Sequence, residues 1–419
     1  MATAACAVAA TAGCGSKPAP TVVTPTRVTI ARGVALVEPA VDPKPFAAAD
    51  TAFGLDVLRA WCAQYPGQNL VFSPSTLASS LGMAYLGAQG STASAMASVL
   101  HLPADSGTAL AAGLQSRSDA LDKLDGPGVT VAASNQVWAD PTLPTLGSYL
   151  NSVATGYGAG LAKAPFSTDP TAAANEINGA ISTATRGHIT KLVNPAMVSQ
   201  VGWVLTSALY LDAKWATPFD PSKTQSGSFA AAGGHQVTAK YLNGDGFSYA
   251  ITDGWTGVSL PYAGGNLTMT ALLPPAGAAS CALPGAAQLA AITGSLASGN
   301  SGPAAVSLPK VSLSVSGTQG DMKQVLTALG MGQAFSDTAD FTGLSPDAGK
   351  LAFVQQAATL AVAEKGTVGA AAAATGVTAS AGIANRIMVT FDRPYLMLIT
   401  AKATGEPLFL AEVANPTVG

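Results

Sequence analysis

The sequence predicts an α+β domain built on large mixed sheets, and three observations support this class. Helical patterns dominate residues 51–101, long apolar strand patterns follow from residue 129, and the two kinds of element do not alternate strictly. The chain has 419 residues, of which 48% are hydrophobic and 10% charged, so it can bury a large core. No linker-like composition occurs after about residue 45, which favours one domain rather than several.

Helices are expected first. Apolar residues recur every four positions over residues 51–64, which predicts a helix with one buried face. Ser73 is a natural N-cap and Pro74 suits the first position of a second helix. A third capped helix is expected over residues 91–101.

Strand-like runs dominate the rest of the chain. They cover residues 129–138, 201–211, 267–273, 306–315, 351–362, 387–401 and 408–413. The run 201–211 is nearly continuous in apolar residues, as a strand covered on both faces must be. Thr404 and Gly405 predict a hairpin turn between the last two strands.

The N-terminus carries a segment of different character. Residues 1–14 are small and apolar up to Cys14, which resembles the end of a bacterial lipoprotein signal. Cleavage behind Gly13 would leave Cys14 to carry a membrane anchor, in a secreted or cell-surface protein. Thr11 stands where such signals prefer Leu, and no basic segment precedes it, so a disordered Ala-rich tail is the alternative. Residues 15–45, rich in Pro, Thr and Val, predict an extended tether.

The charge pattern excludes one class of partner. The net charge is −3 and the Lys and Arg residues are scattered, so no basic stripe is available for nucleic acid or an anionic membrane surface. Outside the N-terminus no run of 18 or more apolar residues predicts a membrane span.

Two cysteines lie within the folded part, Cys62 and Cys281. They could pair in an oxidising compartment, but their spacing matches no rule that would require it. We interpret them as two separate buried thiols.

The sequence contains no recognisable catalytic or metal-binding pattern. His101, His188 and His235 are scattered, and HExxH, CxxC, GxSxG and phosphate-loop motifs are absent. Each histidine is interpreted as a structural or surface residue. We expect no enzyme, no metal and no cofactor, although a Ser-His-Asp triad assembled from distant residues stays open.

One stretch near the C-terminus has an unusual composition. Residues 366–385 contain neither charge nor proline, and they lie between Lys365 and Arg386 with strand-like runs on both sides. Its side chains are too small and uniform to form a core, and the stretch is too apolar for an ordinary linker. Taken alone it could be an Ala-rich helix, since Ala is the best helix former.

Six segments resemble the serpins, in the same order and at comparable spacings. They are residues 69–102, 205–220, 259–275, 326–345, 363–376 and 389–399. The last, VTFDRPYLMLI, fits the family signature except that Tyr395 stands where Phe is usual. The resemblance implies a serpin-like single domain over residues 46–419, with three β-sheets, about eight or nine helices and an exposed reactive loop at about 364–388. Such a protein is expected to be a monomer.

The resemblance also implies a function. Serpins inhibit serine proteases as suicide substrates: the protease cuts the loop and forms an acyl-enzyme, and the cut loop then enters the central sheet as an extra strand. The implied partner is therefore a target serine protease, held in a covalent acyl complex by a bacterial-type inhibitor. A strand that enters a formed sheet must avoid proline and charge, which suits the composition of residues 366–385.

The hinge of the loop corresponds, by resemblance, to a short run after the last central strand. It comprises Glu364, Lys365, Gly366, Thr367, Val368 and Gly369. Inhibitory serpins usually carry an acidic residue and Ala after the hinge Thr, where this chain has Val368 and Gly369. A non-inhibitory serpin-fold binding module, whose loop is only cleaved, is therefore the alternative.

The resemblance names two further clusters in the central sheet. At its top lies the breach, an aromatic residue and an ion pair, which correspond to Trp215, Lys310 and Glu364. Beneath its middle lies the shutter, a polar cluster, which corresponds to Ser73, Thr76, Ser207 and Gln356. The last two replace Asn and His of the family but keep donors and acceptors. Ordinary sheet packing is the alternative for the breach.

Two ways of counting place the reactive-site bond differently. Counting forward from Glu364 by the usual hinge length gives Ser380 followed by Ala381, whereas counting back from Phe391 gives Ile383, and Gly382 lies between them. All candidates are small or aliphatic, which favours elastase-like or subtilisin-like proteases over trypsin-like ones.

Overall fold

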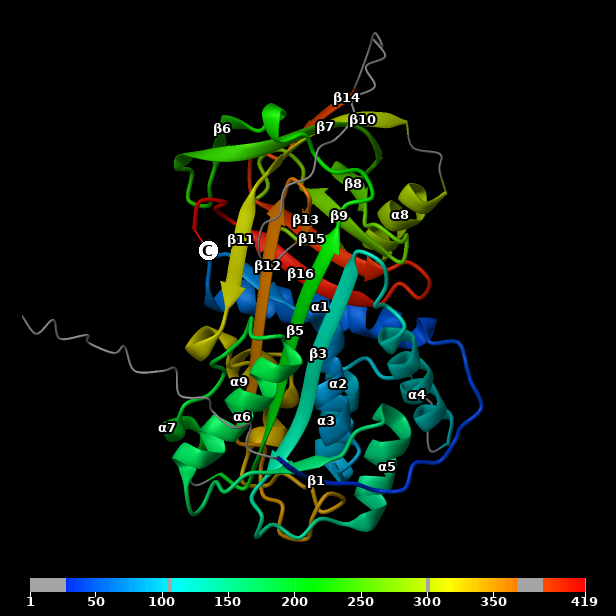
Figure 1. Ribbon diagram of the computed structural model, residues 1–419, viewed down its shortest axis with the longest axis vertical. Coiled ribbons are helices and arrows are strands. Elements are labelled where there is room, and N and C mark those ends of the chain that lie inside the picture. The colour runs from blue at the N-terminus through cyan, green and yellow to red at the C-terminus, as the bar shows by residue number, and fades with distance from the viewer. Residues whose placement is uncertain (1–27, 104–107, 200, 299–301, 368–386, 419) are drawn as a thin grey trace, which may run out of the picture.

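The computed structural model describes residues 28–103, 108–199, 201–298, 302–367 and 387–418. A tall sheet faces the viewer in Figure 1, and helices surround its lower half while a second sheet lies behind its upper half. No helix in these ranges combines the length and apolar character needed to cross a membrane.

The described residues form nine α-helices, in agreement with the number that the resemblance implies. They are α1 (Lys44–Gln64), α2 (Pro74–Tyr85), α3 (Gly90–Val99), α4 (Thr108–Asp122), α5 (Gly147–Tyr157), α6 (Pro170–Ala184), α7 (Pro195–Val198), α8 (Ala286–Ala297) and α9 (Lys323–Ala328). Ser73 caps α2 as expected, because its Oγ accepts a hydrogen bond from the Thr76 amide at 3.2 Å.

Seven strands of the described residues form the central sheet. In spatial order they are β1 (Thr29–Ala31), β4 (Leu161–Lys163), β3 (Val129–Ala139), β5 (Trp203–Lys214), β13 (Gly366–Thr367), β12 (Val354–Ala363) and β11 (Val311–Val315). In the lower part β12 pairs directly with β5 in parallel, from Val354 opposite Leu205 to Ala358 opposite Leu209. Higher up, β13 lies between these two strands (Figure 1).

The second sheet contains nine strands within the part of the chain that the structure describes. They are β14 (Ile387–Thr390), β10 (Pro303–Pro309), β7 (Gln236–Thr252), β8 (Trp255–Pro261), β9 (Leu267–Leu273), β15 (Tyr395–Ala401), β16 (Pro407–Val413) and β2 (Leu70–Phe72), with β6 (Gln225–Ala230) also on β7. The first part of β7 pairs with β6 and β10, and its last residues pair with β8. The second and third sheets of the expected fold are therefore joined through one long strand.

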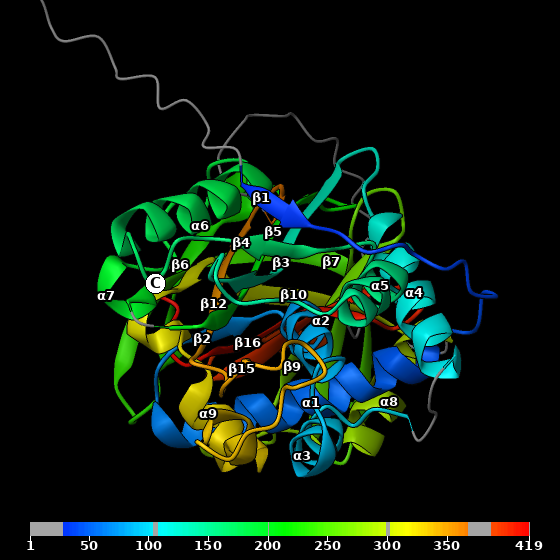
Figure 2. The ribbon, with the colours of Figure 1, turned by 90° about the horizontal axis from the view of Figure 1, so that it is seen from below.

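Helix α2 connects the two sheets. It contacts β3 and β5 of the central sheet and β16 of the second sheet, and Figure 2 shows it between them. Leu77 and Leu81 of α2 are fully buried in a core that also contains Leu209 and Phe409. Helix α2 therefore packs between the middle of the central sheet and the second sheet.

The segment before α1 lies against the body of the protein. Its strand β1 pairs antiparallel with β4, and the chain then crosses α5 and α4 (Figure 2). The amides of Val34 and Leu36 donate to Asn151 Oδ1 at 2.8 Å and Thr155 Oγ1 at 2.9 Å. The Glu38 amide donates to Gln115 Oε1 of α4 at 3.0 Å, so the expected tether over residues 15–45 includes a portion, residues 28–43, that is bonded to two helices.

Cys62 and Cys281 form a disulfide with an S–S distance of 2.06 Å, so the expectation of two separate thiols is wrong. Cys62 lies in the last turn of α1 and Cys281 in the loop before α8, and the fold brings their Cα atoms within 5.9 Å. That spacing is normal for a disulfide. A separation of 219 residues in sequence gives no signal of such proximity.

Candidate functional site

The three residues assigned to the breach meet at the top of the central sheet. Lys310 Nζ donates to both carboxylate oxygens of Glu364 at 2.9 Å, and Thr224 Oγ1 donates to Glu364 Oε1 at 3.0 Å. Trp215 Nε1 donates to the Ala363 carbonyl at 2.8 Å. The end of β12 is therefore held from both sides.

The carboxyl of Glu364 is partly buried in this cluster. Burial is the largest influence on it and raises its pKa, but the hydrogen bonds from Lys310 and Thr224 outweigh burial and hold the pKa below its usual value. Glu364 is thus a stable anion beside the entrance to the sheet.

The hinge residues Gly366 and Thr367 already lie inside the central sheet. After β12 the chain turns at residues 364–365 and returns as β13, with Thr367 opposite Val362 on one side and Ala213 of β5 on the other. At Gly366 a Cβ atom would lie 2.1 Å from the Ala213 carbonyl oxygen, so only glycine fits. The sequence predicts a hinge here but does not predict that its first residues are paired.

Thr367 is anchored by a residue that the sequence analysis did not select, Tyr262. Their hydroxyl oxygens lie 2.5 Å apart, and both side chains are buried. Burial raises the pKa of Tyr262, so its hydroxyl stays protonated. The Tyr262 ring stacks on Trp215 with centroids 4.5 Å apart, which connects the hinge to the breach. Tyr262 lies within the segment 259–275 that resembles serpins. Its place in that segment is the one feature of the sequence that could have indicated a role at the site.

The four residues assigned to the shutter also come together, beneath the point where β5 and β12 still pair. Ser207 Oγ donates to Thr76 Oγ1 at 2.9 Å, and Gln356 Nε2 donates to the Ser73 carbonyl at 3.1 Å. Ser207 and Gln356 are opposite each other in the β5–β12 ladder. Each strand is therefore bonded to the first turn of α2 rather than to the other strand's side chain.

Asn135 of β3 extends the shutter cluster. It is opposite Ser207 in the ladder, and with its amide nitrogen turned towards α2 it donates to the Thr76 carbonyl at 3.2 Å. Gln356 Oε1, by contrast, is buried and accepts no hydrogen bond from any residue that the structure describes. A buried acceptor without a donor costs about 1–3 kcal/mol, so the hydrogen bonding of the central sheet is incomplete at Gln356.

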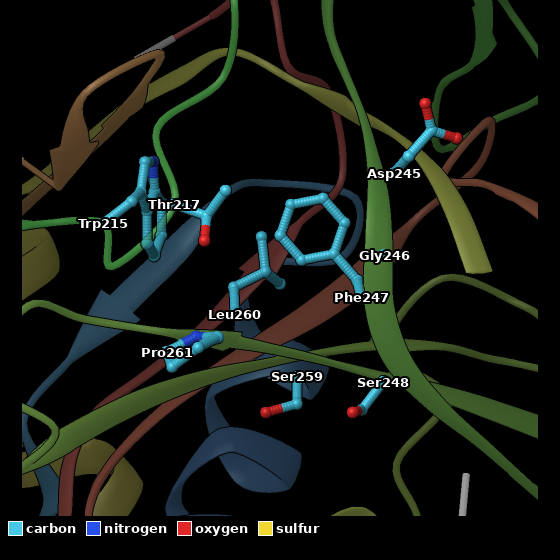
Figure 3. Close-up of a pocket in the computed structure, with 9 residues that line it drawn as sticks. All are labelled: Trp215, Thr217, Asp245, Gly246, Phe247, Ser248, Ser259, Leu260 and Pro261. Atoms are coloured by element: carbon cyan, nitrogen blue, oxygen red, sulfur yellow. The ribbon is translucent and has the colours of Figure 1, made fainter. Parts of the chain in front are cut away.

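A small cavity of about 140 Å³ adjoins the breach. Figure 3 shows the rings of Trp215 and Phe247 on its two sides, with Leu260 and Pro261 near them. Trp215 therefore contacts Tyr262 on one ring face and lines a cavity as well, so the breach is not packed solid.

The remaining predicted site residues lie outside the described residues. They are Cys14, Val368, Gly369, Ser380, Ala381, Gly382 and Ile383. The described chain resumes in β14, which pairs in parallel with β10 of the second sheet. The described residues on either side of 368–386 therefore belong to different sheets.

A family model for serpins, described as serine protease inhibitors, matches residues 48–416. The chain belongs to the serpin family. Serpins are generally protease inhibitors rather than catalysts, which agrees with the absence of catalytic motifs from the sequence.

Relatives and solved structures support the same assignment. An uncharacterised serpin-like protein of Thermococcus kodakarensis is 30% identical over 380 residues, covering 90% of this chain and 87% of that protein. The bovine leukocyte elastase inhibitor is 29% identical, covering 88% of this chain and 99% of the inhibitor. The native state of tengpin, a thermophilic serpin, has a similar fold with a TM-score of 0.78 at 22% identity, covering 93% of this chain and all of tengpin.

The relatives of this chain differ in the activity that their names state. The pig thyroxine-binding globulin is 28% identical, covering 88% of this serpin and 89% of the globulin. Because the Thermococcus relative is archaeal and others come from animals, similarity does not indicate a bacterial origin. The relatives agree on the fold and differ in their named activity.

Proposed function

We propose that this serpin is a suicide inhibitor of a serine protease and that its cut reactive loop inserts between β5 and β12. The observation that carries the proposal is β13: the hinge residues Gly366 and Thr367 already pair with both of these strands. Further residues could extend β13 downwards, because β5 and β12 pair directly only up to Leu209 and Ala358.

The chemistry requires only the protease's own groups. Its serine oxygen attacks the carbonyl carbon of the reactive-site residue, the peptide bond to the next residue breaks, and the new amine leaves with a proton. The ester that remains links the protease to the loop. Insertion of the loop then removes the ester from the geometry that water needs for hydrolysis.

The shutter is where this opening must break contacts. Ser207 and Gln356 are each bonded to the start of α2, so separation of β5 and β12 must break one of these hydrogen bonds together with the direct ladder between the strands. The unpaired Gln356 Oε1 could gain a donor from an inserted backbone. Every inserted residue also adds ladder hydrogen bonds.

The small or aliphatic side chains of the candidate reactive-site residues 380–383 support an elastase-like or subtilisin-like target. We propose Ser380–Ala381 as the reactive-site bond, with Gly382 and Ile383 as the alternatives. Incubation with elastase or subtilisin should give an SDS-stable complex on a gel, and sequencing the released N-terminus would locate the cut. Ser380→Arg should recruit trypsin if Ser380 sets specificity. Only cleaved serpin, with every protease tried, would refute inhibition.

A binding module whose loop is only cleaved is the second candidate. Two observations favour it: Val368 and Gly369 depart from the inhibitory hinge pattern, and the relatives include a thyroxine-binding globulin. Gly in a strand costs about 0.5–1 kcal/mol relative to Ala, which slows insertion slightly. A Gly369→Ala variant that forms complexes where the wild-type chain is only cleaved would support this candidate.

We further propose that the serpin is exported as a monomer and anchored through a lipid on Cys14. The support is the small, apolar composition of residues 1–14. Expressed in a bacterium, the wild-type chain should be recovered in the membrane fraction, and Cys14→Ala should move it to the soluble fraction. A soluble wild-type protein that retains residues 1–13 would contradict the anchor.

A further inference from the structure

Exposed apolar side chains are uncommon in the body of this serpin. Among the described residues from 44 to 413, large hydrophobic side chains are exposed at three positions, Ile251, Ile387 and Met388. Two of these are neighbours on β14, where Ile387 is 46% exposed and Met388 is 64% exposed. A single exposed apolar residue needs no explanation, but two adjacent ones on one strand identify a surface that a partner could cover.

Strand β14 is also an edge strand of the second sheet. Among the described strands it pairs with β10 alone, with Ile387 opposite Ala304 and Met388 opposite Ala305. Pro303, the first residue of β10, is exposed as well. Natural edge strands are usually protected by charged side chains or by a covering segment, whereas β14 contains no charged residue. We call Pro303, Ile387 and Met388 the edge patch.

The edge patch is open on both faces of the sheet. Because side chains alternate along a strand, Ile387 and Met388 point to opposite faces. Ile387 ends a row that runs through Ala304 to Phe247 of β7, and both of these are buried. Val389, the next residue of β14, is 5% exposed. The exposure is therefore confined to the start of β14, which is the end that follows the reactive loop in sequence.

The proposed reactive-site bond is a short length of chain away from the edge patch. Ile387 follows Ser380 by seven positions and the alternative Ile383 by four. An extended chain advances at most about 3.6 Å per residue, so the patch lies within about 25 Å of either bond. A protease domain of about 220 residues has a radius of gyration of about 17 Å. Its body is therefore wide enough to reach the edge patch while its catalytic serine attacks the loop.

The composition of the reactive site gives a reason for a second contact. Its candidate residues are Ser380, Ala381, Gly382 and Ile383, and the first three have side chains that bury little apolar area in a specificity pocket. Recognition of the protease must then depend on surface outside the cut bond. Methionine adapts its shape to a partner and is enriched at protein interfaces, so Met388 suits such a contact.

We propose that the edge patch is a docking surface for the target protease, which it contacts through an apolar area beside the enzyme's cleft. This rests on the proposed function, in so far as a protease must cut the loop. The patch acts before the bond breaks, because β14 lies on the C-terminal side of the cut and is not part of the segment that inserts. It should therefore raise the rate of cutting without changing the fraction of protease that is trapped.

The double change Ile387→Ser with Met388→Ser tests the edge patch. With elastase or subtilisin, the second-order rate constant for cutting the loop should fall about tenfold, since two apolar side chains lose their contact with the enzyme. The N-terminus of the released fragment should be the same as in the wild-type chain, and the ratio of SDS-stable complex to cleaved serpin should not change. An unchanged rate constant for both proteases would overturn the proposal.

Two further variants complete the test. Met388→Gln keeps the length of the side chain and adds polarity, so it decides the matter if the double variant does not fold, and it should lower the rate constant about threefold. Leu36→Ser with Val37→Ser is the matched control, because these residues are 61% and 96% exposed. They belong to the segment before α1, in the lower half of Figure 1, whereas β14 is at the top. An equal loss of rate in this control would show a general effect of surface polarity and refute the patch.

The same measurements separate this inference from inhibition. If the loop is cut but no complex forms, inhibition fails, and the cutting rates of the variants still test the patch. If complexes form equally fast in the wild-type chain and the double variant, inhibition stands and the patch is refuted. A wild-type dimer in sedimentation that the double variant abolishes would show that the patch binds a second copy of this chain. That result would also refute the proposal, as would a loop that neither protease cuts.

Discussion

At the scale of single residues, the side-chain hydrogen bond between Tyr262 and Thr367 adds to the backbone pairing that holds the hinge in the sheet. Tyr262→Phe keeps the ring that stacks on Trp215 and removes only the hydroxyl. We expect a loss of about 0.5–1.5 kcal/mol in the free energy of unfolding. We also expect a larger fraction of cleaved, uncomplexed serpin in a titration against protease, because insertion would start from a hinge outside the sheet.

Tyr241→Phe is the matched control for that change. Tyr241 is also buried, and its hydroxyl donates to the Ser228 carbonyl at 2.9 Å, far in sequence from the hinge. It should cost similar stability and leave the ratio of complex to cleaved serpin unchanged. If both variants shift that ratio equally, the effect is one of general stability and the role given to Tyr262 is wrong.

Gly366 makes a second prediction possible. A Cβ atom at this position would also approach Lys214 Cα at 2.7 Å, and both neighbours are backbone that cannot turn away. Gly366→Ala should therefore expel β13 and lower the free energy of unfolding by roughly 1–3 kcal/mol in urea titration. Gly202→Ala has open space around the new atom and should be close to neutral. A Gly366→Ala variant as stable as the wild-type chain would show that β13 can shift at little cost in free energy.

At the scale of elements, the Lys310–Glu364 pair joins the end of β12 to the connection between β10 and β11. Because the folded pKa of Glu364 is lowered, its stabilisation is present above the usual glutamate pKa of about 4.3 and is lost as pH falls through the folded value. Lys310 is 38% exposed, so water screens the pair and its coupling should be at most about 1 kcal/mol.

A double-mutant cycle with Glu364→Gln and Lys310→Met measures that coupling directly. Unfolding free energies at pH 7 should give a favourable interaction of a few tenths to about 1 kcal/mol, and the cycle repeated at successively lower pH should show the interaction disappear as the Glu364 carboxyl is protonated. A coupling that stays constant down to the lowest pH at which the protein is folded would mean that packing, and not charge, joins the two side chains.

The elements also show what sequence patterns can and cannot locate. Continuous apolar runs predicted the core strands β5, β9 and β16, because burial on both faces leaves a strong signal. The run 306–315 proved to be two strands, β10 and β11, which separate at Lys310 and enter different sheets. Strands β6 to β8 were missed because glycine and polar residues interrupt their alternation.

The candidate site was predictable only through the family resemblance. Nothing in the local sequence of Ser73, Ser207 or Gln356 indicates that their side chains meet, since the contacts join residues more than 100 positions apart. Tyr262 was missed because a tyrosine at the end of a strand-like run has an ordinary packing explanation. The disulfide and the pairing of β1 with β4 likewise depend on tertiary proximity that composition does not report.

At the scale of the whole molecule, the paired hinge and the end of direct β5–β12 pairing at Leu209 predict that the uncut fold is not its most stable form. Insertion of about ten loop residues would add ladder hydrogen bonds worth roughly 1 kcal/mol each. Each kcal/mol raises the unfolding temperature of a large domain by about 2 °C. Cleavage by subtilisin within the loop should therefore raise that temperature by on the order of 20 °C in calorimetry.

Ala373→Pro provides the control, because proline removes a ladder donor in the middle of the segment that must insert. The variant should be cleaved as readily as the wild-type chain, but its unfolding temperature should stay near that of the uncut protein, and it should form no SDS-stable complex. If the wild-type chain also shows no rise after cleavage, the loop does not enter the sheet. The second candidate, a binding module, would then be the better account of this serpin.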